Sequence, residues 1–243
     1  MEIIRTVMSR LGRFGGLVLF AMFVVVAGVW AFVALLEEVN EGETYRFDSA
    51  VLNWVATHQG PRWMQEVVRD ITALGGLAVL SFVSLAVLGF LILTRRHHAT
   101  LALVVAVVGG VTISLVLKWA IDRPRPSVMP HGSIVHTASF PSGHSMLSSV
   151  VYLTLGTLLA RITRERVLRV YFLLLALVLT GAVGVSRVYL GVHWPTDVLA
   201  GWSAGLAWAT LCWLGATWLQ SRGMIESTLA LTSEPVGENH LER

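Results

Sequence analysis

The segment FPSGHSM, residues 140–146, combines the signals of a helix start with a histidine. Proline is tolerated in the first turn, Ser142 can cap the helix, and Gly143 lets a ligand approach the backbone. A helix N-terminus presents free N–H groups to an anion, and His144 could donate a proton to a group held there. The alternative is an ordinary capped helix with a histidine at a membrane interface.

The segment SRVYLGVHWPTDVLAG, residues 186–201, places His193 four residues before Asp197. Pro195 suits the first position of a helix, so Asp197 falls in its opening turn and His193 lies just outside it. A carboxylate that holds the Nδ1–H of an imidazole leaves Nε2 free as a base or nucleophile. Asp197 is also expected to raise the pKa of His193. Plain capping by Asp197 is the competing interpretation.

Four cationic residues accompany these two segments, with only Asp122 and Asp197 nearby to balance them. They are Lys118, Arg123 and Arg125 in KWAIDRPRPS, and Arg187. A phosphate would suit such a cluster, because arginine offers a planar fork to phosphate oxygens and lysine a compact point charge. Lys118 is the sole lysine of the chain. It either faces a wet interior site or extends to the lipid headgroups.

A zinc site is the natural competitor for the histidines. Zinc usually takes three or four ligands, whereas two histidines and one aspartate are well placed here, among cations that would repel a metal. The sequence therefore predicts neither a metal nor another cofactor. Cys212 is the only cysteine, which excludes an intrachain disulfide. His131 and His136 could line the entrance to a site, and the remaining histidines are assigned no chemistry.

The helices that must carry these residues are visible as long uncharged spans. The chain is 55% hydrophobic and only 14% charged, as in polytopic membrane proteins. The spans cover residues 14–36, 71–94, 97–117, 126–160, 170–186 and 198–221, and the fourth enters the membrane near Gly143. We predict an all-α bundle of six transmembrane helices. The first span is too long for the apolar part of a cleaved signal peptide, which is the alternative.

The distribution of arginine predicts the orientation of the bundle. Cytoplasmic loops carry an excess of lysine and arginine. An N-terminus in the cytoplasm puts ten arginines on that side: Arg5, Arg10, Arg13, Arg95, Arg96, Arg161, Arg164, Arg166, Arg169 and Arg222. Both termini are then cytoplasmic, and the residues considered above face the periplasm or exterior. Topology thus explains the net charge of +3 better than nucleic-acid binding does.

One membrane domain is expected over residues 1–220, followed by a polar, flexible cytoplasmic tail over 221–243. Apolar residues at helical spacing around a Gly60-Pro61 break predict two short interfacial helices at about 47–72. These helices either lie over a cavity or pack against the bundle without a gating role. Gly201 and Gly205, four residues apart, would permit close helix packing.

Taken together, KWAIDRPRP, PSGH and SRVYLGVHWPTD resemble the three signatures of the type 2 phosphatidic acid phosphatase (PAP2) family. The resemblance implies a six-helix bundle of the PAP2/haloperoxidase-like type. It also implies that His193 is the nucleophile, that Asp197 orients it, and that His144 protonates the leaving oxygen and then activates water. The phosphate would be held by Lys118, Arg125 and Arg187, with hydrogen bonds from Ser142 and Gly143. Arg123 lies outside the strict signature and is assigned an auxiliary role.

The predicted activity is metal-independent hydrolysis of a lipid phosphate through a phosphohistidine, in the cell (inner) membrane. Undecaprenyl diphosphate, phosphatidylglycerol phosphate and phosphatidate all remain candidate substrates. A phosphotransferase that uses the same residues is the main alternative, and a non-catalytic protein that binds or transports lipid phosphates is another. The expected partners are the lipid bilayer and its phosphorylated lipids, with no nucleic acid, and the oligomeric state stays open.

Overall fold

A computed structural model describes residues 2–127 and 138–221, and within these ranges the chain forms helices and no strands. The elements are α1 (Glu2–Glu41), α2 (Tyr45–Thr57), α3 (Arg62–Ala73), α4 (Leu77–Leu93), α5 (His97–Ala120), α6 (Gly143–Ile162), α7 (Arg166–Tyr189) and α8 (Pro195–Ser221). The predicted all-α fold is confirmed. Residues 222–243 of the predicted tail, and His131 and His136, lie outside the described residues.

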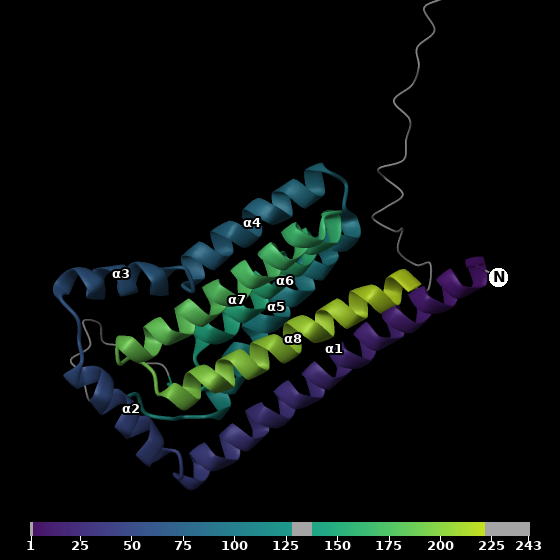
Figure 1. The fold of residues 1–243 in the computed structure, drawn as a ribbon. Helices are drawn as coiled ribbons and strands as arrows, with labels where there is room; N and C mark the ends of the chain where they lie inside the picture. Colours follow the sequence, from purple (N-terminus) through teal and green to yellow (C-terminus); the bar gives the residue numbers. More distant parts are fainter. Residues whose placement is uncertain (1, 128–137, 222–243) are drawn as a thin grey trace, which may run out of the picture.

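The long helices form an elongated bundle with α6 at its centre (Figure 1). α6 packs against α5, α7 and α8, and α1 lies along the outer side of α8. The start of α1 and the end of α8 lie at one end of the bundle, and α2 and α3 lie at the other. The end that carries α2 and α3 is also where α5 and α7 finish and where α6 and α8 begin.

Length and apolarity make five of the described helices candidates for crossing a membrane, or six if α3 and α4 together form one bent span. The multi-pass membrane fold is therefore confirmed, with a count of five or six spans. The span predicted over 71–94 is interrupted, because α3 and α4 meet at an angle of 45°. Gly75 lies at this break, where a Cβ would collide with Val183 of α7. The break thus brings the backbone directly against the bundle.

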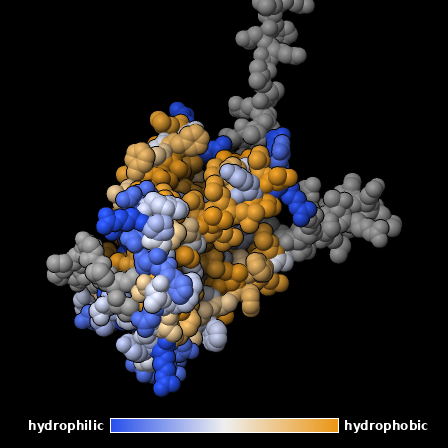
Figure 2. Space-filling model, turned by 60° about the vertical axis from the view of Figure 1, so that its left-hand side comes forward, coloured by the Kyte–Doolittle hydropathy of each residue, from blue (hydrophilic) through white to orange (hydrophobic). Residues whose placement is uncertain are grey.

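The surface of the bundle matches a membrane environment. Large apolar side chains such as Phe23, Trp30, Phe82 and Trp119 are more than half exposed. Figure 2 shows a broad apolar face beside hydrophilic residues that gather at the end carrying α2 and α3. Polar ends beside an apolar belt are what a bilayer requires of a spanning protein.

The predicted close packing at Gly201 and Gly205 is confirmed. A Cβ at Gly201 would lie 2.7 Å from the carbonyl oxygen of Ser142, and one at Gly205 would lie 2.6 Å from that of Met146. Both neighbours are backbone atoms that no rotamer change can move, so α8 approaches α6 only because these positions lack a side chain. This contact fixes the start of α8 against the start of α6.

We expect Gly205→Ala to destabilise the bundle by about 1–3 kcal/mol, because the added methyl group would force α8 away from α6. The measurement is the midpoint of thermal unfolding in detergent. Gly215→Ala is the matched control on the same helix, since a Cβ there meets nothing within 4 Å. Equal midpoints for the two variants would contradict the packing described here.

The two short helices predicted near residues 47–72 are present as α2 and α3. α2 buries Asp48, Leu52 and Val55. Phe47 and Trp54 of α2 are more than half exposed, as is Trp63 of α3, and α3 has no buried residue. Exposed aromatic side chains are typical of helices that lie at a membrane interface. That location remains a prediction.

Candidate active site

Residues from all three signature segments lie at the end of the bundle where α5 and α7 finish and α6 and α8 begin. Lys118 is in the last turn of α5, and Arg187 is in the last turn of α7. His144 is close enough to both cations, and to Arg125 and His193, to interact with them electrostatically. The predicted residues therefore converge on one place in space.

The ring of His193 lies between a carboxylate and a guanidinium. Its Nδ1 is 3.3 Å from Oδ2 of Asp197, and its Nε2 is 3.2 Å from Nη1 of Arg125. Arginine can only donate hydrogen bonds, so Nε2 must accept from Arg125 and the proton must reside on Nδ1. This tautomer leaves the Nε2 lone pair directed toward the cations, which is the arrangement that a nucleophile needs.

Asp197 is fully buried and receives several donors besides His193. Arg123 Nη1 donates to Oδ1 at 2.5 Å, the backbone N–H of Trp194 donates to Oδ2 at 3.0 Å, and the hydroxyl of Ser139 also donates to Oδ2. Its backbone carbonyl accepts from the N–H of Ser142 at 2.9 Å. Asp197 thus joins the start of α8 to the start of α6 and is held as a carboxylate.

Burial lowers the pKa of His193 from 6.5 to about 4. The hydrogen bond and charge of Asp197 raise this pKa, as the sequence predicted, whereas Arg187 and Arg125 lower it further. Asp197 therefore acts in the predicted direction, but the net pKa of His193 lies below its ordinary value. Desolvation outweighs the carboxylate, because the imidazole is completely enclosed. At neutral pH the ring is uncharged and available as a nucleophile.

Nitrogen NMR of protein labelled in its histidines can test whether the His193 ring is neutral and has a lowered pKa. We expect the His193 signals to report a neutral ring at neutral pH and to titrate at about pH 4. Arg125→Gln should raise the pKa of His193, because it removes a positive charge that opposes protonation. Asp197→Asn should lower it, and a His193→Gln spectrum assigns the signal. Titration of His193 near its ordinary value of 6.5 would contradict the burial found here.

Lys118 turns into the site. Its Nζ donates to the carbonyl oxygen of Ala138 at 2.9 Å, and its Cε lies 3.3 Å from where a Cβ on Gly143 would stand. The side chain therefore follows the start of α6, where a larger residue in place of Gly143 would crowd it. The interior placement is the one observed, and extension toward lipid headgroups is not.

Ser142 is the N-cap of α6, as predicted, and the helix begins at Gly143. Its Oγ accepts from the backbone N–H of Ser145 at 3.4 Å, and the side chain is fully buried. α8 likewise begins at Pro195, with Asp197 in its first turn. Both helix starts are thus where the sequence places them, because proline and the cap residue mark them locally.

Arg187 and Arg125 border the histidines from two elements. Nη1 of Arg187 donates to Thr72 Oγ1 of α3 at 3.1 Å, and its Nε is buried with no hydrogen-bond partner among the described residues. Nη1 of Arg125 donates to the carbonyl oxygen of Val192 at 2.8 Å. Arg125 thereby lies beside Nε2 of His193, and Arg187 is close enough to act on the ring electrostatically.

Arg123 makes different contacts from the other three cations. It lies between two buried carboxylates, with Nη2 at 2.8 Å from Oδ2 of Asp48 and Nη1 on Asp197. Its guanidinium also lies 5.4 Å from the ring centroid of Trp194. The cluster of four cations expected from the sequence is therefore a group of three, because Asp48 of α2 neutralises Arg123. The auxiliary role assigned to Arg123 is consistent with this position.

Sequence reasoning did not single out Asp48 and Ser139. Asp48 accepts from the N–H of Thr196 at 3.0 Å and from its hydroxyl at 2.7 Å, and so holds the first turn of α8 as well as Arg123. The signal that could have revealed it was Arg123 itself, an arginine without an assigned partner in an apolar setting. Ser139 lies one residue before the helix-start motif, and nothing in its spacing indicates Asp197.

Comparison with known proteins agrees with the three signatures. The family model of the PAP2 superfamily matches residues 99–221, which hold every signature residue. The chain belongs to the PAP2 superfamily. The predicted family and enzyme class, a phosphatase of the membrane, are thereby confirmed.

Several PAP2 proteins resemble this one over long stretches. The chain is 32% identical to phosphatidylglycerophosphatase B of Bacillus subtilis over 181 residues, which cover 72% of this chain and 86% of that protein. It is 29% identical to undecaprenyl-diphosphatase of Sulfolobus acidocaldarius, with 47% of this chain and 54% of that protein covered. The crystal structure of a transmembrane PAP2 type phosphatidylglycerolphosphate phosphatase from Bacillus subtilis matches with a TM-score of 0.73 and 28% identity, covering 84% of this chain and 98% of that one.

Proposed function

We propose that this PAP2 protein hydrolyses the phosphate or diphosphate of a membrane lipid by transferring the phosphoryl group to Nε2 of His193 and then to water. The observation that carries the proposal is the neutral His193 ring, oriented by Asp197 at 3.3 Å and presenting Nε2 to Arg125 at 3.2 Å. A phosphorus atom bound by Arg125 would stand in front of that lone pair.

The first step forms an N–P bond at His193 and breaks the P–O bond between the transferred phosphorus and the leaving oxygen, which belongs to the lipid in a monophosphate and to the inner phosphate in a diphosphate. His144 is assigned the proton that the departing oxygen needs, and it then accepts a proton from the water that attacks the phosphohistidine. Water supplies the oxygen of the released phosphate, and Nε2 is returned to its starting state. This sequence balances with no group other than substrate, water and the two histidines.

Lys118, Arg125 and Arg187 are assigned to the phosphate oxygens. Phosphoryl transfer depends mainly on positioning and on charge stabilisation at these oxygens, and fixed cations supply both. The buried Nε of Arg187, without a partner among the described residues, is one donor suited to the anion. The first N–H groups of a helix lack intrahelical partners, so those of Gly143 and His144 can add further hydrogen bonds.

A lipid substrate is supported by the position of the site at the end of apolar, exposed helices. The similarity to phosphatidylglycerophosphatase B and to undecaprenyl-diphosphatase makes phosphatidylglycerol phosphate and undecaprenyl diphosphate the first substrates to test. Phosphatidate shares the same phosphate chemistry and completes the panel. The arginine distribution supports a site on the periplasmic or outer side, with both termini in the cytoplasm.

The test is phosphate release by purified protein from these three lipids, with a metal chelator present. We expect release from at least one lipid, unchanged by the chelator and lost in His193→Ala. If the product is a phosphorylated acceptor and not free phosphate, the protein is a phosphotransferase and not a hydrolase. Lipid binding without turnover in the wild type would support a carrier, and loss of activity on chelation would overturn the metal-independent route.

A further inference from the structure

A pocket lies at the other end of the bundle from His193. It has a volume of about 460 Å³ and lies between the end of α4, the start of α5 and the ends of α6 and α8. Arg161 of α6 lines it, seventeen residues along the helix from His144, which corresponds to roughly 25 Å. The active site described above does not use this pocket.

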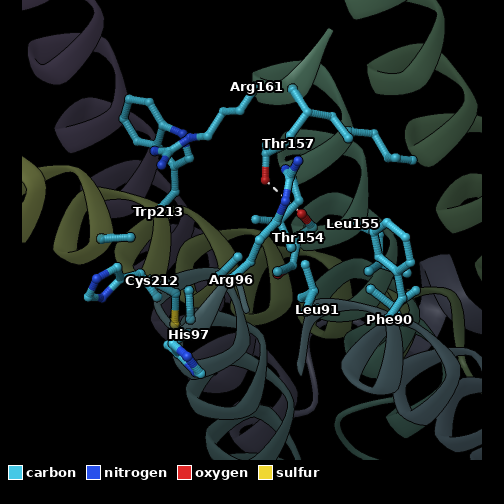
Figure 3. Close-up of a pocket in the computed structure, with 18 of the residues that line it drawn as sticks. Phe90, Leu91, Arg96, His97, Thr154, Leu155, Thr157, Arg161, Cys212 and Trp213 are labelled. Carbon is cyan, nitrogen blue, oxygen red and sulfur yellow. Dashed lines mark hydrogen bonds between the residues drawn. The ribbon is translucent and has the colours of Figure 1, made fainter. Parts of the chain in front are cut away.

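The pocket joins an apolar interior to a cationic border. Its apolar lining includes Phe90, Leu91, Leu155 and Trp213, and Figure 3 shows these side chains around the same hollow as Arg96 and Arg161. The arginine and histidine residues that line it are Arg95, Arg96, His97, His98 and Arg161. No acidic side chain lines the pocket within the described part of the chain. Its size falls within the roughly 300–1,000 Å³ of small-molecule sites.

Arg161 is built into this border. Its Nη2 donates to Thr217 Oγ1 at 2.5 Å, and its guanidinium lies 5.3 Å from the ring centroid of Trp213. Thr154, which also lines the pocket, has a buried hydroxyl without a hydrogen-bond partner among the described residues. The pocket thus offers fixed positive charge and an unsatisfied polar group above an apolar space.

We propose that this pocket binds an anionic phospholipid of the adjacent leaflet. The headgroup phosphate would lie against Arg95, Arg96 and Arg161, and part of an acyl chain would occupy the space beside Leu91 and Leu155. Clusters of arginine next to membrane helices attract anionic lipids, and basic pockets between helices bind their headgroups. Charge complementarity favours an anionic lipid over a zwitterionic one, and this lipid is a ligand rather than a substrate.

Cys212 provides a direct probe, because it lines the pocket and is the sole cysteine of the chain. Full-length protein is placed in nanodiscs of phosphatidylcholine alone or of an equimolar mixture with phosphatidylglycerol. The rate at which N-ethylmaleimide alkylates Cys212 is followed by mass spectrometry. We expect phosphatidylglycerol to slow the reaction. In Arg95→Gln and Arg161→Gln, lipid binding should weaken about fivefold, the change expected on losing one arginine beside an anionic lipid.

Arg164→Gln is the matched control, because Arg164 is exposed in the α6–α7 loop and does not line the pocket. In this variant, phosphatidylglycerol should slow the alkylation of Cys212 as much as it does in the wild type. Equal rates in the two lipids, or protection that survives in both pocket variants, would overturn the proposal. Arg95 is exposed in a turn, so Arg95→Gln tests the site even if Arg161→Gln fails to fold. Native mass spectrometry gives a second readout: retained phosphatidylglycerol in the wild type, and its loss in Arg95→Gln.

Discussion

Replacing His193 by alanine is expected to lower kcat by at least about 10⁴-fold, because the variant has no nucleophile to accept the phosphoryl group. His144→Ala is expected to lower kcat by about 10²–10⁴-fold, since it removes only proton transfer. The two histidines lie close enough to interact, and the proposed mechanism assigns them different roles. The measurement is steady-state phosphate release from a lipid phosphate that the wild-type protein hydrolyses.

The leaving group separates these two roles. With a nitrophenyl phosphate ester as substrate, the leaving group is nitrophenolate, which departs without a proton. This substrate should therefore restore phosphohistidine formation in His144→Ala, whereas His193→Ala should form no phosphohistidine with it. His58→Ala is the matched control, because His58 is exposed after α2 and stacks on Trp54. It should retain wild-type kcat. Equal rescue of both active-site variants would contradict the assigned roles.

Removal of Arg123 is expected to have the largest effect on stability. Arg123→Met would leave two carboxylates, Asp48 and Asp197, buried without the cation that now pairs with both. Breaking a buried ion pair from one side costs about 3–5 kcal/mol, which a thermal unfolding midpoint in detergent would register. The same change frees the carboxylate that orients His193, so kcat should fall by about 10²-fold.

A double-mutant cycle distinguishes the loss of the Arg123–Asp48 ion pair from a general loss of stability. Asp48→Asn keeps the size of the side chain and can still accept the N–H of Thr196, so it should cost less than Arg123→Met. The two changes together should cost less than the sum of each alone, because they remove both charges of one pair. Arg46→Met, at an exposed position of α2, is the control. A wild-type midpoint for Arg123→Met would refute the pairing.

The parts of the fold that follow from local chemistry could be predicted from the sequence. Long uncharged spans set the membrane helices, and the starts of α6 and α8 follow from Ser142 and Pro195, which act on their own neighbours. Gly201 and Gly205 indicated a close contact but not with which helix. The site could be assembled because its three segments lie at the ends of consecutive long helices, and antiparallel neighbours bring alternate ends together.

Contacts between distant segments could not be predicted in this way. Asp48 pairs with Arg123 across 75 positions, and only the fold places α2 against the start of α8. The net pKa of His193 also needs the structure, because it depends on how completely the ring is enclosed. The pocket around Cys212 is lined by side chains from four helices, and none of these side chains belongs to a motif.

The most direct test of the account is to trap the covalent intermediate. His144→Ala is mixed with a nitrophenyl phosphate ester carrying radiolabelled phosphate, quenched in alkali, in which phosphohistidine survives, and digested for peptide mapping. We predict label on Nε2 of His193, formed at a rate no slower than product release, and none in His193→Ala. Turnover without label on His193, or label on another residue, would contradict the central claim that this imidazole accepts the phosphoryl group.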